Sequence, residues 1–420
     1  MKPRLAFIRR AYMPVVERAR EMFEVAYEDR QLTADEALRL VEAHKADAIF
    51  FTSTFKFDAD FIAALPDSVK VAASASSFLD HADIAAARAR GLILTYAPDI
   101  ATGCVADLAF GLVIGAARGF GLHTRTMRER TWQTRTMGEG LGTRIWGKTM
   151  GVIGFGRIGR AFAHRARGFG MRMVYHDLRR AADQIEHGAE FYPDLKEMLP
   201  RCDFVSLHTP LNVATRHILD RGTLALLPRG AIVVNSARGG LIDETALIEL
   251  LESGHLGGAG LDVFEQEPSF NPRLAELDNV FLTPHINSAT RETRLALGYA
   301  CLEDIAAVLE GRAPLRPAGE GIDHLNLRLP FVYQKLRKWL RRDNKQFARW
   351  RTNGLAVQLD GMAFVDFRDR DSLVEALRQR LLHLDLGTAN RVRMAQSFRQ
   401  VVQQITHASP QEKCFKTSLG

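Results

Sequence analysis

The sequence predicts an α/β protein with two doubly wound parallel-sheet domains and a small C-terminal α+β appendage. Short apolar segments alternate with amphipathic, helix-like segments over residues 1–318, which is typical of parallel sheets covered by helices. A glycine-spaced segment, GVIGFGRIGR at 151–160, lies unusually far into the chain of 420 residues. The net charge of +7 is concentrated in residues 321–420, where Lys and Arg outnumber Asp and Glu two to one. This change in composition indicates a domain boundary.

The overall composition is that of a soluble globular protein, with 46% hydrophobic and 25% charged residues. No apolar run approaches the roughly 18 residues of a membrane span, and the apolar stretch near the N-terminus is too short for a secretory signal. The cysteines have neither metal-ligand nor disulfide-framework spacing; they are Cys104, Cys202, Cys301 and Cys414. We therefore expect reduced thiols, no metal site and a cytoplasmic protein.

The first hundred residues contain five predicted strands, separated by helix-like stretches such as DEALRLVEAHK and DIAAARAR. The strands lie within RLAFIR, FEVAYE, DAIFFTS, VKVAASA and GLILTYA. This alternation predicts a first parallel sheet with helices on both faces.

A second alternating unit follows a long apolar helix, VADLAFGLVIGAARG, and a polar stretch, LHTRTMRERTWQTRTMGEG. Its six predicted strands lie within TMGVIGF, MRMVYHD, CDFVSLH, GAIVVNSA, GAGLDVF and NVFLTPH. Six parallel strands with interleaved helices complete a doubly wound domain. A last helix, ETRLALGYACLEDIAAVLEG, ends before the Pro/Gly-rich linker APLRPAGEG.

The glycine-spaced segment has the context of a dinucleotide-binding turn, because an apolar strand precedes it and a helix follows. Gly154 permits the tight turn, Gly156 lets the backbone approach a pyrophosphate, and Gly159 allows the helix to pack closely on the strand. The N-terminus of that helix then presents unpaired N–H groups to the phosphates.

The next predicted strand ends at Asp177. Its carboxylate can accept hydrogen bonds from both ribose hydroxyls of NAD and would repel the 2′-phosphate of NADP. Arg179 and Arg180 follow directly, and they either lie solvated on the surface or bind that phosphate. The sequence therefore favours NAD and leaves NADP open.

Three further predicted strands each end just before an ionisable residue. VVNSARGGLIDE places Arg238 after the fourth strand, LDVFEQEP places Glu267 after the fifth, and FLTPHINSAT places His285 after the sixth. Ligands bind outside the carboxyl ends of the strands in an open α/β sheet. We therefore expect a guanidinium, a carboxylate and an imidazole at the same edge as the glycine turn.

These segments resemble the D-isomer-specific 2-hydroxyacid dehydrogenase family, and TPHINSATRETR is similar to its glyoxylate/hydroxypyruvate reductase branch. The matching text is GVIGFGRIG, HTPLNVATRHIL, NSARGGLIDETAL, GGAGLDVFEQEP and LDNVFLTPH, in family order. The resemblance implies a flavodoxin-like substrate domain, residues 1–100 and 290–318. A Rossmann NAD-binding domain, residues 101–289, is inserted into it, so the glycine turn lies mid-chain. Residues 319–420 form the appendage.

The resemblance also implies that the protein interconverts a small 2-keto acid and its D-2-hydroxy acid with NAD(H). Arg238 would bind the carboxylate and carbonyl oxygen, His285 would transfer the proton, and Glu267 would orient the imidazole. Asp262 would hold the nicotinamide carboxamide. The further cofactor contacts that the family implies fall on Arg157, Ile158, Pro210, Thr215, Ala237 and Ser288.

The loop expected to hold the substrate carboxylate departs from the family pattern. It usually contains Gly-x-Gly, whereas this chain has SASSFLDHAD, with Ser76 and Phe78 at the glycine positions. A phenylalanine there is expected to change the loop path or to narrow the pocket. The expected substrate contacts are Ser53, Ser76, Ser77, Phe78 and Arg238.

Two other kinds of function are compatible with the same fold, a non-catalytic one and the oxidation of a different substrate. NAD-sensing transcriptional corepressors retain the Arg/Glu/His set, so a non-catalytic NAD-binding role is the alternative, and turnover of 2-keto acids distinguishes the two. A relative acting on formate or phosphite is disfavoured. Glu267 stands where formate enzymes have Gln, and SASSF lacks the Lys expected for phosphite.

The long helix after Val105 and the TMRERTWQTRTMG arm are similar to the family's dimerisation elements, so we expect a homodimer. In the appendage, residues 331–352 have helical spacing with a basic face, and LAVQLDGMAFVDF is typical of a hairpin. VEALRQRLLHL and RVRMAQSFRQVVQQI indicate further helices. The basic face is either solvated or contacts nucleic acid or an anionic membrane.

Overall fold

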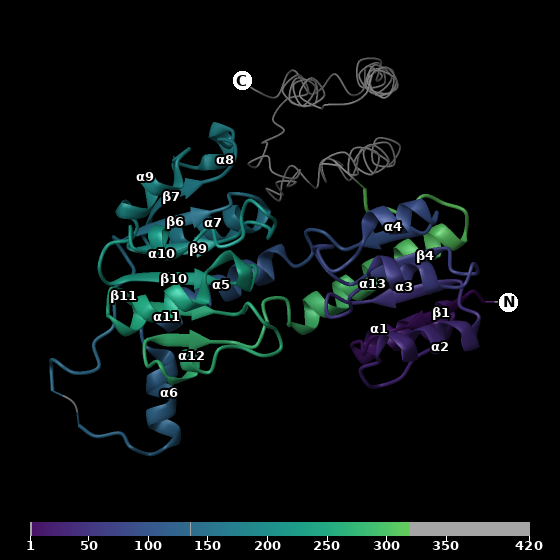
Figure 1. Ribbon diagram of the computed structural model, residues 1–420, viewed down its shortest axis with the longest axis horizontal. Helices are drawn as coiled ribbons and strands as arrows, with labels where there is room; N and C mark the ends of the chain where they lie inside the picture. Colours follow the sequence, from purple (N-terminus) through teal and green to yellow (C-terminus); the bar gives the residue numbers. More distant parts are fainter. Residues whose placement is uncertain (1, 135, 320–420) are drawn as a thin grey trace, which may run out of the picture. The chain divides into compact units, whose positions relative to one another are not determined.

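The computed structural model describes residues 2–134 and 136–319, which form two parallel sheets (Figure 1). The first sheet has five strands in the order β2-β1-β3-β4-β5, which is the flavodoxin order. Its strands are β1 (Arg4–Phe7), β2 (Glu24–Ala26), β3 (Ala48–Phe51), β4 (Val71–Ser74) and β5 (Ile93–Tyr96).

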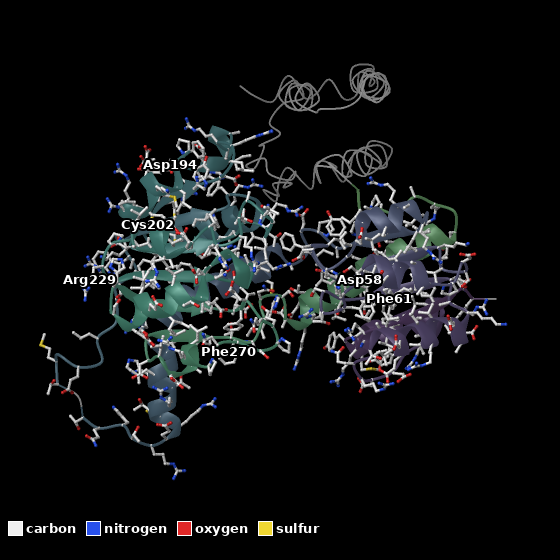
Figure 2. All side chains as sticks on the ribbon, viewed as in Figure 1. Asp58, Phe61, Asp194, Cys202, Arg229 and Phe270 are labelled. Carbon is white, nitrogen blue, oxygen red and sulfur yellow. The ribbon has the colours of Figure 1, made fainter. Side chains whose placement is uncertain are left out.

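Four helices connect these strands, namely α1 (Met13–Met22), α2 (Ala34–His44), α3 (Ala59–Ala64) and α4 (Ile84–Ala89). Side-chain caps fix where three of them begin, and at α4 the Asp83 carboxylate accepts a hydrogen bond from the Ala86 N–H at 2.8 Å. Thr33 and Glu36 form a capping box at α2. At α3, the Asp58 carboxylate accepts a hydrogen bond from the Phe61 N–H at 3.1 Å (Figure 2).

The helix α13 (Arg291–Leu309) follows the second sheet in the chain but packs on the first, against α1, β4 and β5 (Figure 1). Gly298 permits this close approach, because a Cβ at that position would overlap the side chain of Val15. Leu302 and Ile305 of α13 are buried with the apolar residues of β1 and β3. The first domain is therefore built from two separate parts of the chain.

The second sheet has seven parallel strands in the order β12-β11-β10-β9-β6-β7-β8. They are β6 (Thr149–Ile153), β7 (Arg172–His176), β8 (Glu190–Phe191), β9 (Phe204–Leu207), β10 (Ala231–Asn235), β11 (Leu256–Leu261) and β12 (Val280–Leu282). Six of them were predicted. The additional strand, β8, pairs only with β7 at the sheet edge, and its two residues are too few to show a strand pattern in the sequence.

Helices cover both faces of this sheet. They are α5 (Thr102–Ala117), α6 (Phe120–Arg128), α7 (Arg157–Gly168), α8 (Asp183–Glu186), α9 (Leu195–Met198), α10 (Arg221–Leu224), α11 (Glu244–Glu252) and α12 (Arg273–Glu276), with 3₁₀ turns at Leu199–Arg201 and Gly239–Leu241. Glycine lets α5 sit close to β11, because a Cβ at Gly260 would lie 2.8 Å from the Leu112 carbonyl oxygen. Cys202 is fully buried in the core of this domain (Figure 2).

The predicted α/β class with two parallel sheets is confirmed. Within the described ranges no single helix is long and apolar enough to cross a membrane, and α5 and α6 meet those criteria only together, across a 71° bend. The hairpin and helices predicted for the appendage lie outside the described residues. The domain boundaries at residues 101 and 289 stay predictions.

Candidate active site

The predicted site residues follow six neighbouring strands of the second sheet. The glycine turn follows β6, Asp177 follows β7, Pro210 follows β9, and Arg238, Glu267 and His285 follow β10, β11 and β12. All these strands are parallel, so their carboxyl ends lie at one edge of the sheet. Ligands bind at that edge in open α/β sheets.

The glycine turn combines a tight backbone, a close helix contact and open space. Gly154 has a φ of 90°, a backbone conformation that residues with a side chain rarely adopt. A Cβ at Gly159 would overlap the Gly154 carbonyl oxygen, so only glycine lets α7 approach the turn this closely. Around Gly156 the space is open, since no heavy atom lies within 4 Å of a Cβ placed there.

Arg157, the first residue of α7, has a guanidinium N–H group that is available to bind an anion. Its Nε pairs with Asp99 Oδ1 at 2.6 Å, from the loop after β5. Its Nη1 is buried without a hydrogen-bond partner in the described part of the chain. An unpaired guanidinium N–H beside a helix N-terminus fits a bound phosphate, so these residues fit a dinucleotide.

The Asp177 carboxylate is held at the end of β7 by two backbone groups. Oδ2 accepts a hydrogen bond from the Phe155 N–H and Oδ1 accepts one from the Leu178 N–H, both at 2.7 Å. Each carboxylate oxygen can accept a second hydrogen bond. The side chain therefore has acceptor capacity left, and its predicted contact with the ribose hydroxyls stays a prediction.

The two arginines after Asp177 differ in their surroundings. Arg180 binds the buried Glu186 carboxylate through Nε at 2.9 Å and Nη2 at 3.0 Å. Glu186 also accepts a hydrogen bond from the Tyr175 hydroxyl at 2.5 Å, and burial together with this bond raises the pKa of Tyr175 to about 12. Arg179 is exposed. The Arg180 fork is thus already engaged within the protein.

The remaining predicted cofactor residues lie in loops at this edge or, for Ile158, in the first turn of α7. Thr215 Oγ1 donates to the Pro210 carbonyl oxygen at 2.7 Å and closes the loop after β9. The Ala237 N–H donates to Asn235 Oδ1 at 3.0 Å. Ile158 and Ser288 are half-buried, in the first turn of α7 and in the loop after β12.

Glu267 and His285 are in direct contact. Glu267 Oε2 lies 2.6 Å from His285 Nδ1, and Oε1 accepts a hydrogen bond from the Phe264 N–H at 3.1 Å. Burial raises the pKa of Glu267, but the hydrogen bond to His285 and the nearby charges outweigh burial and hold this pKa below its usual range. The pair can keep one imidazole nitrogen fixed while the other faces outward.

Asp262 shapes the loop that carries His285. This fully buried carboxylate accepts hydrogen bonds from Thr283 Oγ1 at 2.6 Å, the Ile286 N–H at 2.8 Å and the Asn287 N–H at 2.9 Å. His285 itself has a φ of 51°, which is uncommon for a residue with a side chain. The carboxylate thus holds the loop around a strained backbone position, while its predicted contact with the carboxamide stays a prediction.

Arg238 meets a carboxylate that the sequence analysis did not identify. Its Nε and Nη2 bind the two oxygens of Asp80 at 2.5 and 2.9 Å, and its Nη1 donates to the Ala237 carbonyl oxygen at 2.6 Å. The Phe78 ring centroid lies 5.3 Å from the guanidinium carbon. The loop at 76–81 of the first domain therefore holds Arg238 of the second.

A model of the NAD-binding domain of the D-isomer-specific 2-hydroxyacid dehydrogenases matches residues 110–287. The glyoxylate reductase of Thermococcus onnurineus is 37% identical over 336 residues, which cover 79% of this chain and 99% of that protein. The chain belongs to the D-isomer-specific 2-hydroxyacid dehydrogenase family. Like other members, it is an NAD-dependent oxidoreductase, and the predicted family and NAD cofactor are confirmed.

Other relatives of this dehydrogenase are also covered over most of their length. The glycerate dehydrogenase of Hyphomicrobium methylovorum is 37% identical over 298 residues, 70% of this chain and 92% of that protein. The structure of a glyoxylate reductase from Paecilomyes thermophila matches with a TM-score of 0.68 and 32% identity, covering 76% of this chain and 99% of that one. An NADPH-dependent glyoxylate/hydroxypyruvate reductase from Sinorhizobium meliloti, solved with NADP and malonate, has a TM-score of 0.67 and 30% identity, covering 76% and 98%.

The expected substrate loop of the dehydrogenase makes a side-chain hydrogen bond within itself and another to the residue after β5. The Phe78 N–H donates to Ser76 Oγ at 3.4 Å, and Ser77 Oγ donates to the Ala97 carbonyl oxygen at 3.3 Å. Neither Ser76 nor Phe78 has a positive φ, so the loop does not use the left-handed conformation that glycine would allow there. Ser76 is buried and Ser53 is exposed in the turn after β3.

The sequence did not predict the contact of Asp80 with Arg238 in the dehydrogenase. The available signal was the position of Asp80 shortly after β4, at the carboxyl end of a strand, which is the criterion that identified Arg238. No group of three or more His, Cys, Asp or Glu side chains in the described part of the chain is arranged to hold a metal ion.

Proposed function

We propose that this dehydrogenase reduces small 2-keto acids of the glyoxylate and hydroxypyruvate type to their D-2-hydroxy acids. The contact of Glu267 with His285, at the sheet edge that also carries Arg238 and the glycine turn, is the observation that carries the proposal. The names of the relatives, glyoxylate reductase and glycerate dehydrogenase, support this substrate class.

His285 is the proposed proton donor to the carbonyl oxygen. Glu267 binds Nδ1, so Nε2 is the nitrogen available to the substrate. Glu267 stays ionised at neutral pH because its pKa lies below the usual range, so its carboxylate can accept a hydrogen bond from the Nδ1–H. In the oxidative direction the neutral ring accepts the proton from the hydroxyl group.

Arg238 is the proposed ligand of the substrate carboxylate. A planar guanidinium binds a carboxylate through two parallel hydrogen bonds, which orients the keto acid as well as attracting it. When bound, NADH supplies the hydride that reduces the carbonyl carbon. The glycine turn, Arg157 and Asp177 would hold that cofactor.

We further propose that NADH is preferred over NADPH. Asp177 would repel a 2′-phosphate, and the Arg180 fork is bound to Glu186. Both arginines are exposed, so Arg179 is the one that could bind the phosphate without breaking the contact with Glu186. A higher kcat/KM with NADPH than with NADH would contradict this preference.

We propose a homodimer because large apolar side chains are exposed on α6 and on the arm that follows it. Met127, Trp132 and Trp146 have exposed fractions of 59%, 67% and 63%. Large apolar side chains gathered on one segment mark interaction sites. Light scattering after size exclusion should give twice the chain mass, and a monomer would overturn the proposal.

The experiment that tests the activity is NADH oxidation by the full-length protein with glyoxylate, hydroxypyruvate and pyruvate. We expect turnover with at least glyoxylate or hydroxypyruvate, and D-glycerate as the product from hydroxypyruvate. NADH binding without turnover of any of these acids would contradict the enzymatic proposal and favour a non-catalytic NAD-binding role.

A further inference from the structure

The contact between Asp80 and Arg238 joins the two domains at the proposed site. Asp80 belongs to the loop after β4, and Arg238 follows β10. Both Asp80 oxygens bind the arginine, at 2.5 and 2.9 Å. A bidentate pair of this kind fixes the guanidinium plane, which a single contact would not do.

The remaining donors of Arg238 are those that a substrate would need. A guanidinium has five N–H groups, one on Nε and two on each terminal nitrogen. Asp80 accepts hydrogen bonds from the Nε–H and from one N–H of Nη2, and the Ala237 carbonyl oxygen accepts one from Nη1. One N–H on each terminal nitrogen is left. Two such donors suit one carboxylate bound side by side.

Asp80 lies beside a histidine whose side chain is largely buried. His81 Nδ1 lies 3.9 Å from Asp80 Oδ1, and His81 Nε2 lies 2.9 Å from Ser74 Oγ at the end of β4. Burial raises the pKa of Asp80, but the two hydrogen bonds from Arg238 and its positive charge outweigh burial and hold this pKa far below its usual range. The carboxylate therefore keeps its charge at neutral pH.

We propose that Asp80 is the positioning residue of Arg238: it orients the guanidinium so that its two remaining terminal N–H groups bind the carboxylate of a 2-keto acid. This inference rests on the proposed function. Phe78, whose ring lies against the same guanidinium, limits its movement out of that plane. The loop that departs from the family's glycine pattern thus acts on substrate through Arg238.

The test compares Asp80→Asn and Asp80→Glu with Asp67→Asn in the full-length protein. Asp67 is the matched control, because it is a fully exposed aspartate of the same domain that also pairs with an arginine, Arg90. It precedes β4, at the opposite sheet edge from Asp80. The readouts are kcat/KM for glyoxylate and hydroxypyruvate, the dissociation constant of oxalate from the enzyme–NADH complex, and the dissociation constant of NADH.

We expect Asp80→Asn to lower kcat/KM and to weaken oxalate binding by about tenfold to a hundredfold, the loss typical of a mispositioned binding group. NADH binding should not change, whereas a general loss of structure would weaken it as well. Asp80→Glu should restore part of the loss, and Asp67→Asn should behave as wild type.

Two outcomes would overturn the proposal, and they distinguish its own failure from the failure of the proposed function. Unchanged or tighter oxalate binding in Asp80→Asn, with an active wild type, would show that Asp80 is neutral or competes with substrate for Arg238. A wild-type protein that neither reduces keto acids nor binds oxalate would overturn the proposed function, and this inference with it.

Discussion

At the scale of single residues, the contact between Glu267 and His285 determines which nitrogen can transfer a proton. Glu267 also accepts the Phe264 N–H, so the carboxylate is fixed from two sides. The strained His285 backbone is held by Asp262. These contacts give the imidazole a defined orientation.

Replacing Glu267 by Gln should lower kcat for keto-acid reduction by roughly tenfold or more, within the range of general acid–base contributions. The neutral amide can turn its NH₂ group towards Nδ1, so it no longer fixes the orientation that presents Nε2 to the substrate. Steady-state kinetics with glyoxylate and hydroxypyruvate measure the loss.

The control for this variant is Glu265→Gln. Glu265 lies in the same loop and contacts a different histidine, His217. An equal loss in both variants would show that the loop, and not the carboxylate at Glu267, is responsible.

At the scale of elements, the glycine turn between β6 and α7 has two distinct requirements. Gly159 is needed for packing, since a Cβ there would overlap the Gly154 carbonyl oxygen. Gly156 is adjacent to open space, so any requirement for glycine there comes from the ligand.

Gly159→Ala should therefore lower the free energy of unfolding by about 1–3 kcal/mol, the usual cost of overpacking. Gly156→Ala should leave the unfolding of the ligand-free protein within about 0.5 kcal/mol of wild type and weaken NADH binding. Urea unfolding and NADH titration separate the two effects. Equal destabilisation by both variants would contradict this division of roles.

The end of β9 carries a pH-sensitive group. His208 Nδ1 is buried without a partner in the described residues, and Nε2 lies 2.9 Å from Ser206 Oγ. Burial lowers the pKa of His208 to about 3, whereas an unfolded histidine has a pKa near 6.5. The unfolded chain therefore takes up the proton first as the pH falls.

The contribution of His208 to stability should be fully present above about pH 6.5 and be lost between about pH 6.5 and 3. His208→Gln cannot titrate, so its stability should fall less steeply over that window. His164→Gln, an exposed substitution on α7, is the control. Urea unfolding at several pH values gives the slopes, and parallel slopes for wild type and His208→Gln would refute the assignment.

At the scale of the whole molecule, every residue of the proposed site lies between Ser53 and Ser288. A chain ending at Gly319 should therefore keep kcat/KM for keto acids within about twofold, a difference of only about 0.4 kcal/mol. A large loss of activity in the shortened chain would indicate that residues 320–420 contribute to the site or to assembly.

Much of this organisation was predictable because its signals are local. Most strands of both sheets are largely apolar runs of three to six residues, and the glycine spacing predicts the cofactor edge. β8 was missed because two residues carry no pattern. Asp80 and the Glu186–Arg180 pair were missed because they depend on which loops meet in space, and an isolated acidic residue in a sequence does not indicate its partner.

The most direct test of the central claim is a crystal structure of the full-length protein with NAD⁺ and oxamate. We predict that oxamate lies beside nicotinamide C4, with its carboxylate on the terminal nitrogens of Arg238 and its amide oxygen within hydrogen-bond distance of His285 Nε2. Oxamate bound away from Arg238, or a nicotinamide ring remote from His285, would contradict the account.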